Sequence, residues 1–160
     1  MAAPGKWKLY DFAKKYLSDG TFDLDAASSW KIALFLSTSN ANTLSVGTGI
    51  YGDLTNEVAT AFGYTIGGVA ITSPTWTRSG STLTFDCADL APAWTAAGGS
   101  ITGRFAVIYW NGTLNGIVKP LLCVCLMDTA PADVSATDTN PFNITINASG
   151  VFTLTGATAD

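Results

Sequence analysis

Residues that could act in catalysis or bind a metal are few in this chain and widely spaced. The sequence of 160 residues contains no histidine, which removes the commonest general base, the usual nucleophile triads and the commonest metal ligand together. The closest acidic pair is Asp23 and Asp25, whose spacing on an extended chain would suit a calcium ion. The glycine-centred loop and the remaining ligands of a calcium site do not accompany them. We therefore predict a polar connection here, with no catalytic residue and no metal site.

Three cysteines make no stronger case for a metal. Cys123 and Cys125 fall on the same face of an expected strand, and Cys87 is the third. Their neighbours are apolar, and a metal site needs more ligands than these. An odd number of cysteines also argues against a disulfide framework. We expect three buried thiols and no cofactor.

Other classes of ligand are excluded by the same sequence. The glycines of residues 63–68 have no strand before them and no helix after them, so we interpret them as turn positions and not as a phosphate-binding loop. Net acidity, without a basic stripe that carries aromatic residues, excludes nucleic acid as a partner. The longest apolar run is the seven residues 121–127, against roughly 18 or more for a helix that spans a bilayer. No membrane partner is expected.

Composition predicts one domain that leaves apolar surface exposed. A chain of this length suits a single domain with a real core. Only 12% of the residues are charged and 48% are hydrophobic, with a net charge of −4. Such a share of charge is about half the usual one. We therefore expect apolar area to remain on the isolated subunit, where it would form an interface.

The elements that position these residues are expected to be mostly strands. Apolar runs of strand length lie between turn residues at 30–37, 69–73, 75–78, 81–86, 98–110, 118–127, 142–147 and 151–155. Short strands with turn chemistry between them and few helices predict an all-β fold. We expect an antiparallel β-sandwich of the jelly-roll kind at residues 28–160.

The stretch 98–110 is the expected central strand, because its second half is apolar on both faces. Arg104 is the exception inside it and needs a carboxylate or carbonyl partner. A structural pair and a surface-recognition role both stay open for this residue. The expected core consists of Trp30, Ile32, Leu34, Phe85, Phe105, Val107, Leu122, Val124, Ile144, Ile146 and Phe152.

Two short helices complete the expected fold. Trp7, Tyr10 and Leu17 recur at steps of three and four residues, which predicts an amphipathic helix over residues 7–17. Asp53 and Thr55 are suitable caps for a second, inserted helix over residues 54–62.

The first 27 residues are predicted to form a basic amphipathic arm and link. Half of the lysines and arginines lie in the first 15 residues, beside one acid, Asp11. A solvated helix face and an arm that lies on an acidic neighbour both explain this pattern. The partner-binding residues of such an arm would be Lys6, Trp7, Lys8, Tyr10, Phe12, Lys14, Lys15 and Tyr16. We expect residues 28–155 to fold without residues 1–19.

Motifs along most of the chain resemble one family. They are WKIALFLSTSNA (30–41), YGDLTNEVA (51–59), GYTIGG (63–68), SGSTLTF (79–85), WTAAGGSI (94–101), RFAVIY (104–109) and INASGVF (146–152), together with Trp76. In this order they resemble small structural proteins of tailed bacteriophages over residues 28–155. The motifs are specific to that group and say little about the role of each member.

The resemblance implies a virion component with no enzymatic activity, a capsid decoration or cement subunit on the outer capsid surface. Its implied partners are the major capsid protein and other copies of itself, as a homo-oligomer. A tail- or fibre-associated module that binds host-surface glycan through Trp76, Trp94 or Trp110 is the alternative. Lysines in place of a signal peptide's apolar core predict that the protein is made in the host bacterial cytoplasm.

Overall fold

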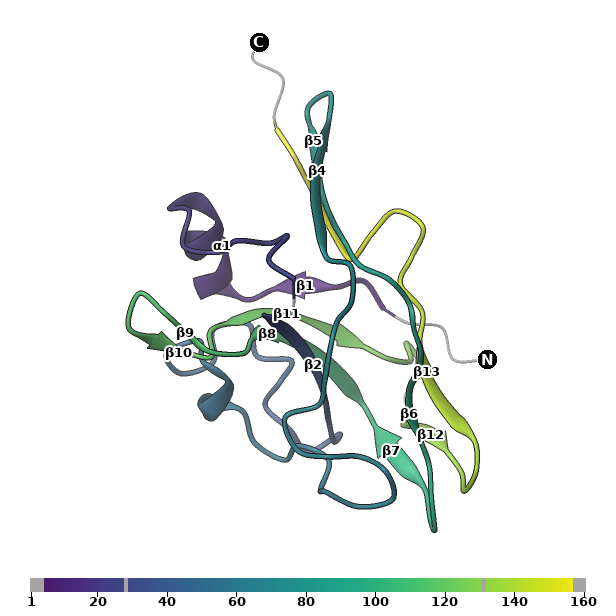
Figure 1. Cartoon of the computed structure of the whole chain (residues 1–160). Coiled ribbons are helices and arrows are strands. Elements are labelled where there is room, and N and C mark those ends of the chain that lie inside the picture. Colours follow the sequence, from purple (N-terminus) through teal and green to yellow (C-terminus); the bar gives the residue numbers. More distant parts are fainter. Residues whose placement is uncertain (1–4, 28, 131, 157–160) are drawn as a thin grey trace.

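The largest sheet of the protein holds five antiparallel strands in the order β1-β11-β8-β2-β3. The computed structural model describes residues 5–27, 29–130 and 132–156. The strands of this main sheet are β1 (Lys8–Leu9), β11 (Leu121–Leu126), β8 (Phe105–Trp110), β2 (Trp30–Phe35) and β3 (Val69–Ala70). Figure 1 shows β2, β8 and β11 crossing the middle of the molecule.

The three central strands of the main sheet form where the sequence is apolar on both faces. Cross-strand pairs join Ile32 to Ile108 and Val107 to Val124. All four side chains are buried, and a strand that is covered on both faces needs such a continuous apolar run. The expectation of a central strand is confirmed for the second half of the stretch 98–110, which is β8.

Arg104 divides the expected central strand in two. β7 (Ile101–Gly103) precedes it and β8 follows it. Its guanidinium Nη1 donates hydrogen bonds to the carbonyl oxygen of Ala130, at 3.1 Å, and to that of Ala132. Arg104 therefore has a structural partner made of backbone carbonyls, and these bonds tie the end of β7 to the segment that follows β11.

Smaller antiparallel sheets complete the fold. A three-stranded sheet contains β4 (Thr75–Ser79), β5 (Thr82–Asp86) and β14 (Phe152–Thr155). Three further pairs are β6 (Leu90–Thr95) with β13 (Pro141–Ile144), β12 (Val134–Ala136) with β7, and β9 (Thr113–Leu114) with β10 (Ile117–Val118). The β4-β5-β14 sheet, here called the projecting sheet, stands out from the body of the molecule with the β4–β5 turn at its tip (Figure 1).

The predicted fold class is confirmed, because the chain is all-β, antiparallel and sandwich-like with a short amino-terminal helix. The described strands are shared among more sheets than the two of a jelly roll. The predicted core residues are all buried except Phe152, which is partly exposed on the projecting sheet. Trp30 lies deep in this core, with its ring centroid 5.1 Å from that of Phe22 and 5.2 Å from that of Trp110.

The amino-terminal helix is shorter than predicted. α1 spans Asp11–Ser18, whereas the helical spacing predicted a start at Trp7. Residues 8 and 9 form β1 instead, paired with Val124 and Cys123 of β11. Without β1 this edge of β11 would leave backbone groups unpaired next to the core, which outweighs the helical spacing. No helix within the described residues has the length and apolar character needed to cross a membrane.

The second predicted helix, over residues 54–62, is wrong. A single turn of 3₁₀ helix, η1 (Tyr51–Asp53), lies before it. The amide of Val58 donates to the carbonyl of Leu34, and the amide of Leu36 donates to the carbonyl of Asn56, both at 2.9 Å. The backbone of residues 56–58 thus bonds to the end of β2, and this tertiary pairing overrides the local helix signal.

Candidate protein-contact surface

The aromatic residues predicted to bind a partner at the amino terminus mostly point inward. Tyr10 is fully buried, and its hydroxyl donates to the carbonyl of Ala41 at 2.6 Å. Tyr16 is also buried, and Trp7 is partly buried against the core. Phe12 remains accessible, at 36% exposure. The prediction that Tyr10 and Tyr16 anchor a partner is therefore wrong, because both belong to the core of this chain.

The predicted lysines lie on the surface, but two of them already have partners. Lys14 and Lys15 each place Nζ 2.7 Å from a carboxylate in or next to α1. Lys6 and Lys8 are exposed, and neither takes part in an ion pair within the described residues. The surplus positive charge of the arm is therefore carried by Lys6 and Lys8.

The amino-terminal arm is not separate from the β domain. Its strand β1 is an edge of the main sheet. The amide of Gly5 donates to the carbonyl of Leu126 at 2.7 Å, and the amide of Tyr10 donates to that of Leu122 at 3.1 Å. These contacts argue against the expectation that residues 28–155 fold without residues 1–19, which a truncated chain would test. Of the predicted domain limits, residues 1, 28 and 160 lie outside the described residues.

Two large hydrophobic side chains protrude from one loop. Phe62 is 47% exposed and Ile66 is 56% exposed, and both lie in residues 59–68, here called the apolar loop. When a partner covers apolar side chains that are exposed to water, the free energy of the system falls, which favours binding. The apolar loop is therefore the strongest candidate contact surface in the described part of the chain.

The backbone of the apolar loop is fixed by hydrogen bonds. The amide of Ala97 donates to the carbonyl of Phe62 at 3.1 Å, and the amide of Ile66 donates to the hydroxyl of Thr60 at 3.0 Å. Phe62 adopts a φ of 52°, in the left-handed region that a bulky residue rarely occupies. Such conformations persist where the surroundings over-determine them, and they cluster at functional sites.

Two glycines let the apolar loop approach neighbouring strands. Gly63 has a φ of 92°, and a Cβ there would lie 2.3 Å from the carbonyl oxygen of Thr95. Gly68 has a φ of 64°, and a Cβ there would lie 1.8 Å from the carbonyl oxygen of Ile32. Backbone atoms do not move aside as a flexible side chain does, so both positions require glycine. The interpretation of these glycines as turn positions is confirmed.

A carboxylate anchors the base of the apolar loop. Oε1 of Glu57 accepts hydrogen bonds from the Tyr64 hydroxyl and the Gly67 amide, each at 2.7 Å. Oε2 accepts one from the Tyr51 hydroxyl. The Tyr109 hydroxyl donates to the carbonyl of Gly67 at 2.8 Å. Three donors satisfy this carboxylate, so the cluster fixes the conformation of the loop.

The tyrosines of this anchor stay protonated well into alkaline pH. Burial, and then the nearby Glu57 carboxylate, raises the pKa of Tyr51 and Tyr64 far above the usual value. The same two causes raise the pKa of Tyr109 to about 12. Because each hydroxyl donates a hydrogen bond, the loss of its proton would break the anchor.

The apolar loop is not predicted by the sequence alone. The sequence pattern places Glu57 and Phe62 within an expected helix, where neither residue stands out. The signal that points to the loop is the three glycines of GYTIGG at residues 63–68, since glycines so close together indicate left-handed backbone. A large apolar residue directly before such a segment is a candidate for exposure.

The three cysteines are free and buried, as predicted. Burial raises the pKa of Cys87 to about 12 and that of Cys125 to about 11, and it raises the pKa of Cys123 well above its usual value. All three are therefore neutral thiols in the folded protein at neutral pH. Among the described residues, no group of three metal-ligating side chains comes together.

The tryptophans of the glycan alternative do not present open faces. Trp94 is buried, with aromatic contacts to Tyr64 and Phe142. Trp76 and Trp110 are partly buried against other aromatic rings. A platform for sugar stacking needs an aromatic face in solvent, so these residues give glycan binding no support.

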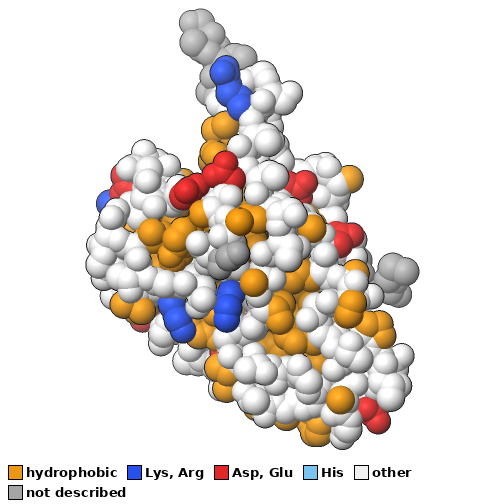
Figure 2. Space-filling model, viewed as in Figure 1, with side chains coloured by type: hydrophobic (Ala, Val, Ile, Leu, Met, Phe, Trp, Pro, Cys, Tyr) orange, Lys and Arg blue, Asp and Glu red, His pale blue; other side chains and the backbone are white. Residues whose placement is uncertain are grey.

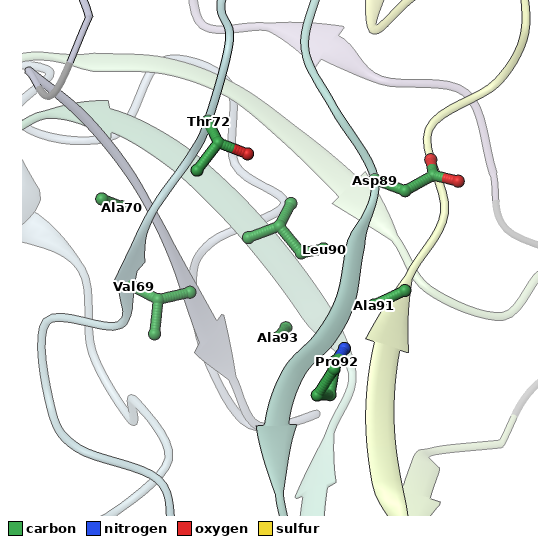
Figure 3. A pocket seen from close by; sticks show the side chains of 8 residues that line it. All are labelled: Val69, Ala70, Thr72, Asp89, Leu90, Ala91, Pro92 and Ala93. Atoms are coloured by element: carbon green, nitrogen blue, oxygen red, sulfur yellow. The ribbon is translucent and has the colours of Figure 1, made fainter.

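A hollow of about 270 Å³ lies between β3 and β6 (Figure 3). Its walls are mostly small and apolar, and Thr72 and Asp89 are its polar members. Figure 3 shows both at one end of the hollow, where the carboxylate of Asp89 accepts the amide hydrogen of Ile146 at 2.7 Å. The convergent polar groups of a small-molecule site do not line this hollow.

No family model, curated protein or solved structure matches this chain. The resemblance of its motifs to phage structural proteins therefore stays a prediction. The apolar loop is the structural feature that bears on function.

Proposed function

We propose that this protein is a non-enzymatic structural component of a tailed-bacteriophage virion, a decoration or cement subunit on the outer surface of the capsid. Its partners in this proposal are the major capsid protein and other copies of itself. The sequence motifs support the assignment to a virion. The apolar loop is the observation that supports a contact function.

The apolar loop supports binding to a protein because it is apolar, exposed and fixed. Full burial of a Phe or Ile side chain is worth roughly 1.5–3 kcal/mol, and about half of each side chain is still in water. A loop that is ordered before binding loses little conformational entropy when the contact forms. Lys6, Lys8 and Phe12 remain exposed candidates for a second contact.

The abundance of the protein in purified virions tests this proposal. A decoration subunit covers the shell, so a stained gel should show it at a copy number approaching that of the major capsid protein. A tail component would be present in far fewer copies. Absence from purified virions would contradict the proposal altogether.

Replacement of the two protruding side chains should weaken binding to shells that lack the protein by at least about tenfold, or roughly 1.4 kcal/mol. The variant is Phe62→Asn with Ile66→Ser, because asparagine tolerates the left-handed backbone at residue 62. Co-sedimentation of the variant with such shells measures the loss. Val118→Ser is the matched control, since Val118 is 55% exposed on β10. Wild-type binding by the double variant would exclude the apolar loop as the contact.

A further inference from the structure

The projecting sheet has two faces of opposite character. Neighbouring residues along a strand point to opposite faces, and residues paired across strands share a face. One face carries two rows, Trp76-Phe85-Phe152 near the body and Arg78-Leu83-Leu154 nearer the tip. The other face carries hydroxyl side chains, from Thr77, Ser79, Thr82, Thr84, Thr153 and Thr155. The hydroxyl face suits solvent, whereas the apolar face requires a cover.

This chain covers the apolar face incompletely, since Trp76 and Phe152 of the row near the body are partly exposed. Phe85 is fully buried. Farther out, Leu83 and Leu154 are partly exposed and line a groove of about 420 Å³ between the projecting sheet and α1. Leu9, Leu17 and Leu24 line the groove from the other side. The outer half of the apolar face thus borders a mostly apolar groove, whose polar lining residues are Ser18 and Lys14, the latter paired with Asp11.

Charges of opposite sign lie at the two ends of this apolar face. Arg78 is exposed next to the turn at the tip, where its Nε donates to the carbonyl of Gly80 at 3.0 Å. Asp23 and Asp25 are exposed on either side of Leu24 in the groove wall. The ion pairs within the described residues include none of these three charges. Figure 2 shows a basic side chain near the tip, hydrophobic ones below it and acidic ones at the base.

Asp23 and Asp25 are two residues apart, and both side chains are exposed. A hydrogen bond with Asp25, followed by burial and the charge of Asp25, raises the pKa of Asp23. Two neighbouring carboxylates without a cation favour a guanidinium, whose planar fork of donors matches carboxylate oxygens.

We propose that a second copy of this chain occupies the groove, with the two projecting sheets packed face to face and running in opposite directions. Leu83 and Leu154 of each copy then fill the groove of the other. The tip of each sheet lies over the base of its partner, so that Arg78 of each copy meets the partner's Asp23 and Asp25.

The charges identify a second copy as the occupant because each chain carries both halves of the contact. A two-fold contact uses the same surface on both subunits, so every group that one copy offers is also one that it accepts. Antiparallel sheets form two sets of opposite-charge contacts. Parallel sheets would set Arg78 against Arg78 and the acidic pairs against each other, so the charges also select the direction. This inference does not depend on the proposed role in a virion.

Charge reversal with mixing tests the inference by sedimentation equilibrium. The wild-type chain should be a dimer. Arg78→Glu alone and Asp23→Lys with Asp25→Lys should each be monomeric, because each homodimer would oppose like charges. An equal mixture of these two variants should form a heterodimer, since both of its contacts then join opposite charges. A chain with all three replacements should again dimerise with itself.

Matched controls keep the outcome clear. Lys6→Glu changes the charge by the same amount as Arg78→Glu, at an exposed position outside the groove, and should leave the dimer intact. Each variant should still unfold in one cooperative thermal transition, because all three charges are on the surface, and the monomeric variants should lack only the stabilisation that dimerisation gives. Leu83→Ser with Leu154→Ser should also be monomeric. The inference would be overturned if the wild type were monomeric, if Arg78→Glu or Asp23→Lys with Asp25→Lys formed homodimers, or if their mixture formed no heterodimer. This holds whether or not the apolar loop binds shells.

Discussion

A variant that lacks residues 1–19 is expected to lose its cooperative thermal transition. The deletion removes β1 from the edge of the main sheet and takes three buried side chains, Tyr10, Ala13 and Tyr16, out of the core. Loss of one buried aromatic side chain costs about 3–5 kcal/mol. A domain of this size has a total stability of about 5–15 kcal/mol. The loss of two buried aromatic side chains and of the strand that pairs with β11 is therefore expected to remove most of the free energy of unfolding.

Point variants separate this explanation from a general effect of truncation. Tyr10→Ala should lower the free energy of unfolding by about 3–5 kcal/mol. Tyr10→Phe should cost about 1 kcal/mol, because it removes only the hydrogen bond to Ala41. Phe12→Ala is the matched control on the exposed side of α1 and should cost much less than Tyr10→Ala. Urea unfolding measures all three, and a folded truncated chain with the wild-type transition would show that the arm is dispensable.

The sequence predicts the core and the fold class well because both follow from long apolar patterns. Trp30, Ile108 and Val124 belong to strands whose apolar character on both faces has no other explanation. Burial of such runs dominates the energetics, so the pattern and the structure agree. The burial of Cys123 and Cys125 is predicted for the same reason, since both lie within one of these apolar strands.

The errors occur where a local signal competes with pairing between distant segments. Trp7 and Tyr10 match a helical spacing, but β11 needs a partner strand at its edge. Asp53 resembles a helix cap, yet its carboxylate accepts the amide hydrogen of Thr48 at 2.6 Å and closes a loop. Local propensities are worth less than 1 kcal/mol per residue, so a few tertiary hydrogen bonds reverse them.

The apolar loop cannot be predicted from the sequence for the same reason, because contacts between distant segments determine its conformation. Phe62 is exposed because Gly63 and Gly68 turn the chain, and because Glu57 anchors the loop at residues seven and ten positions later. No periodic pattern marks such a loop. The projecting sheet differs, because its alternation of threonine with Leu83 and Leu154 is visible in the sequence once the strand register is known.

Stability is expected to fall steeply above about pH 10. Burial raises the pKa of Tyr10, Tyr51 and Tyr64 far above the usual value, and that of Tyr109 to about 12. Below the unfolded pKa of about 10, both states hold these tyrosine protons, so the tyrosines do not make stability depend on pH. Above it the unfolded chain releases protons that the folded chain keeps, so folding becomes less favourable.

The steepness of this loss gives the number of tyrosines involved. Each proton that only the folded state retains lowers stability by about 1.4 kcal/mol per pH unit. Four tyrosines together give a slope of about 5 kcal/mol per unit above pH 10. The buried thiols add to the loss from a lower pH, because an unfolded cysteine titrates near pH 8.5. A chain in which Cys87, Cys123 and Cys125 are replaced by alanine or valine should lack this earlier part.

Two measurements across the same pH range test the expectation. Urea unfolding at a series of pH values gives the slope, and Tyr64→Phe should reduce it by about 1.4 kcal/mol per unit because one titrating group is gone. The change in slope is the decisive quantity, since the lost hydrogen bond to Glu57 lowers stability at every pH alike. Tyrosinate absorbance of the folded protein should show these four hydroxyls ionising only as the structure is lost. Ionisation of all four near pH 10 with the fold intact would show that they are not held as donors inside the protein.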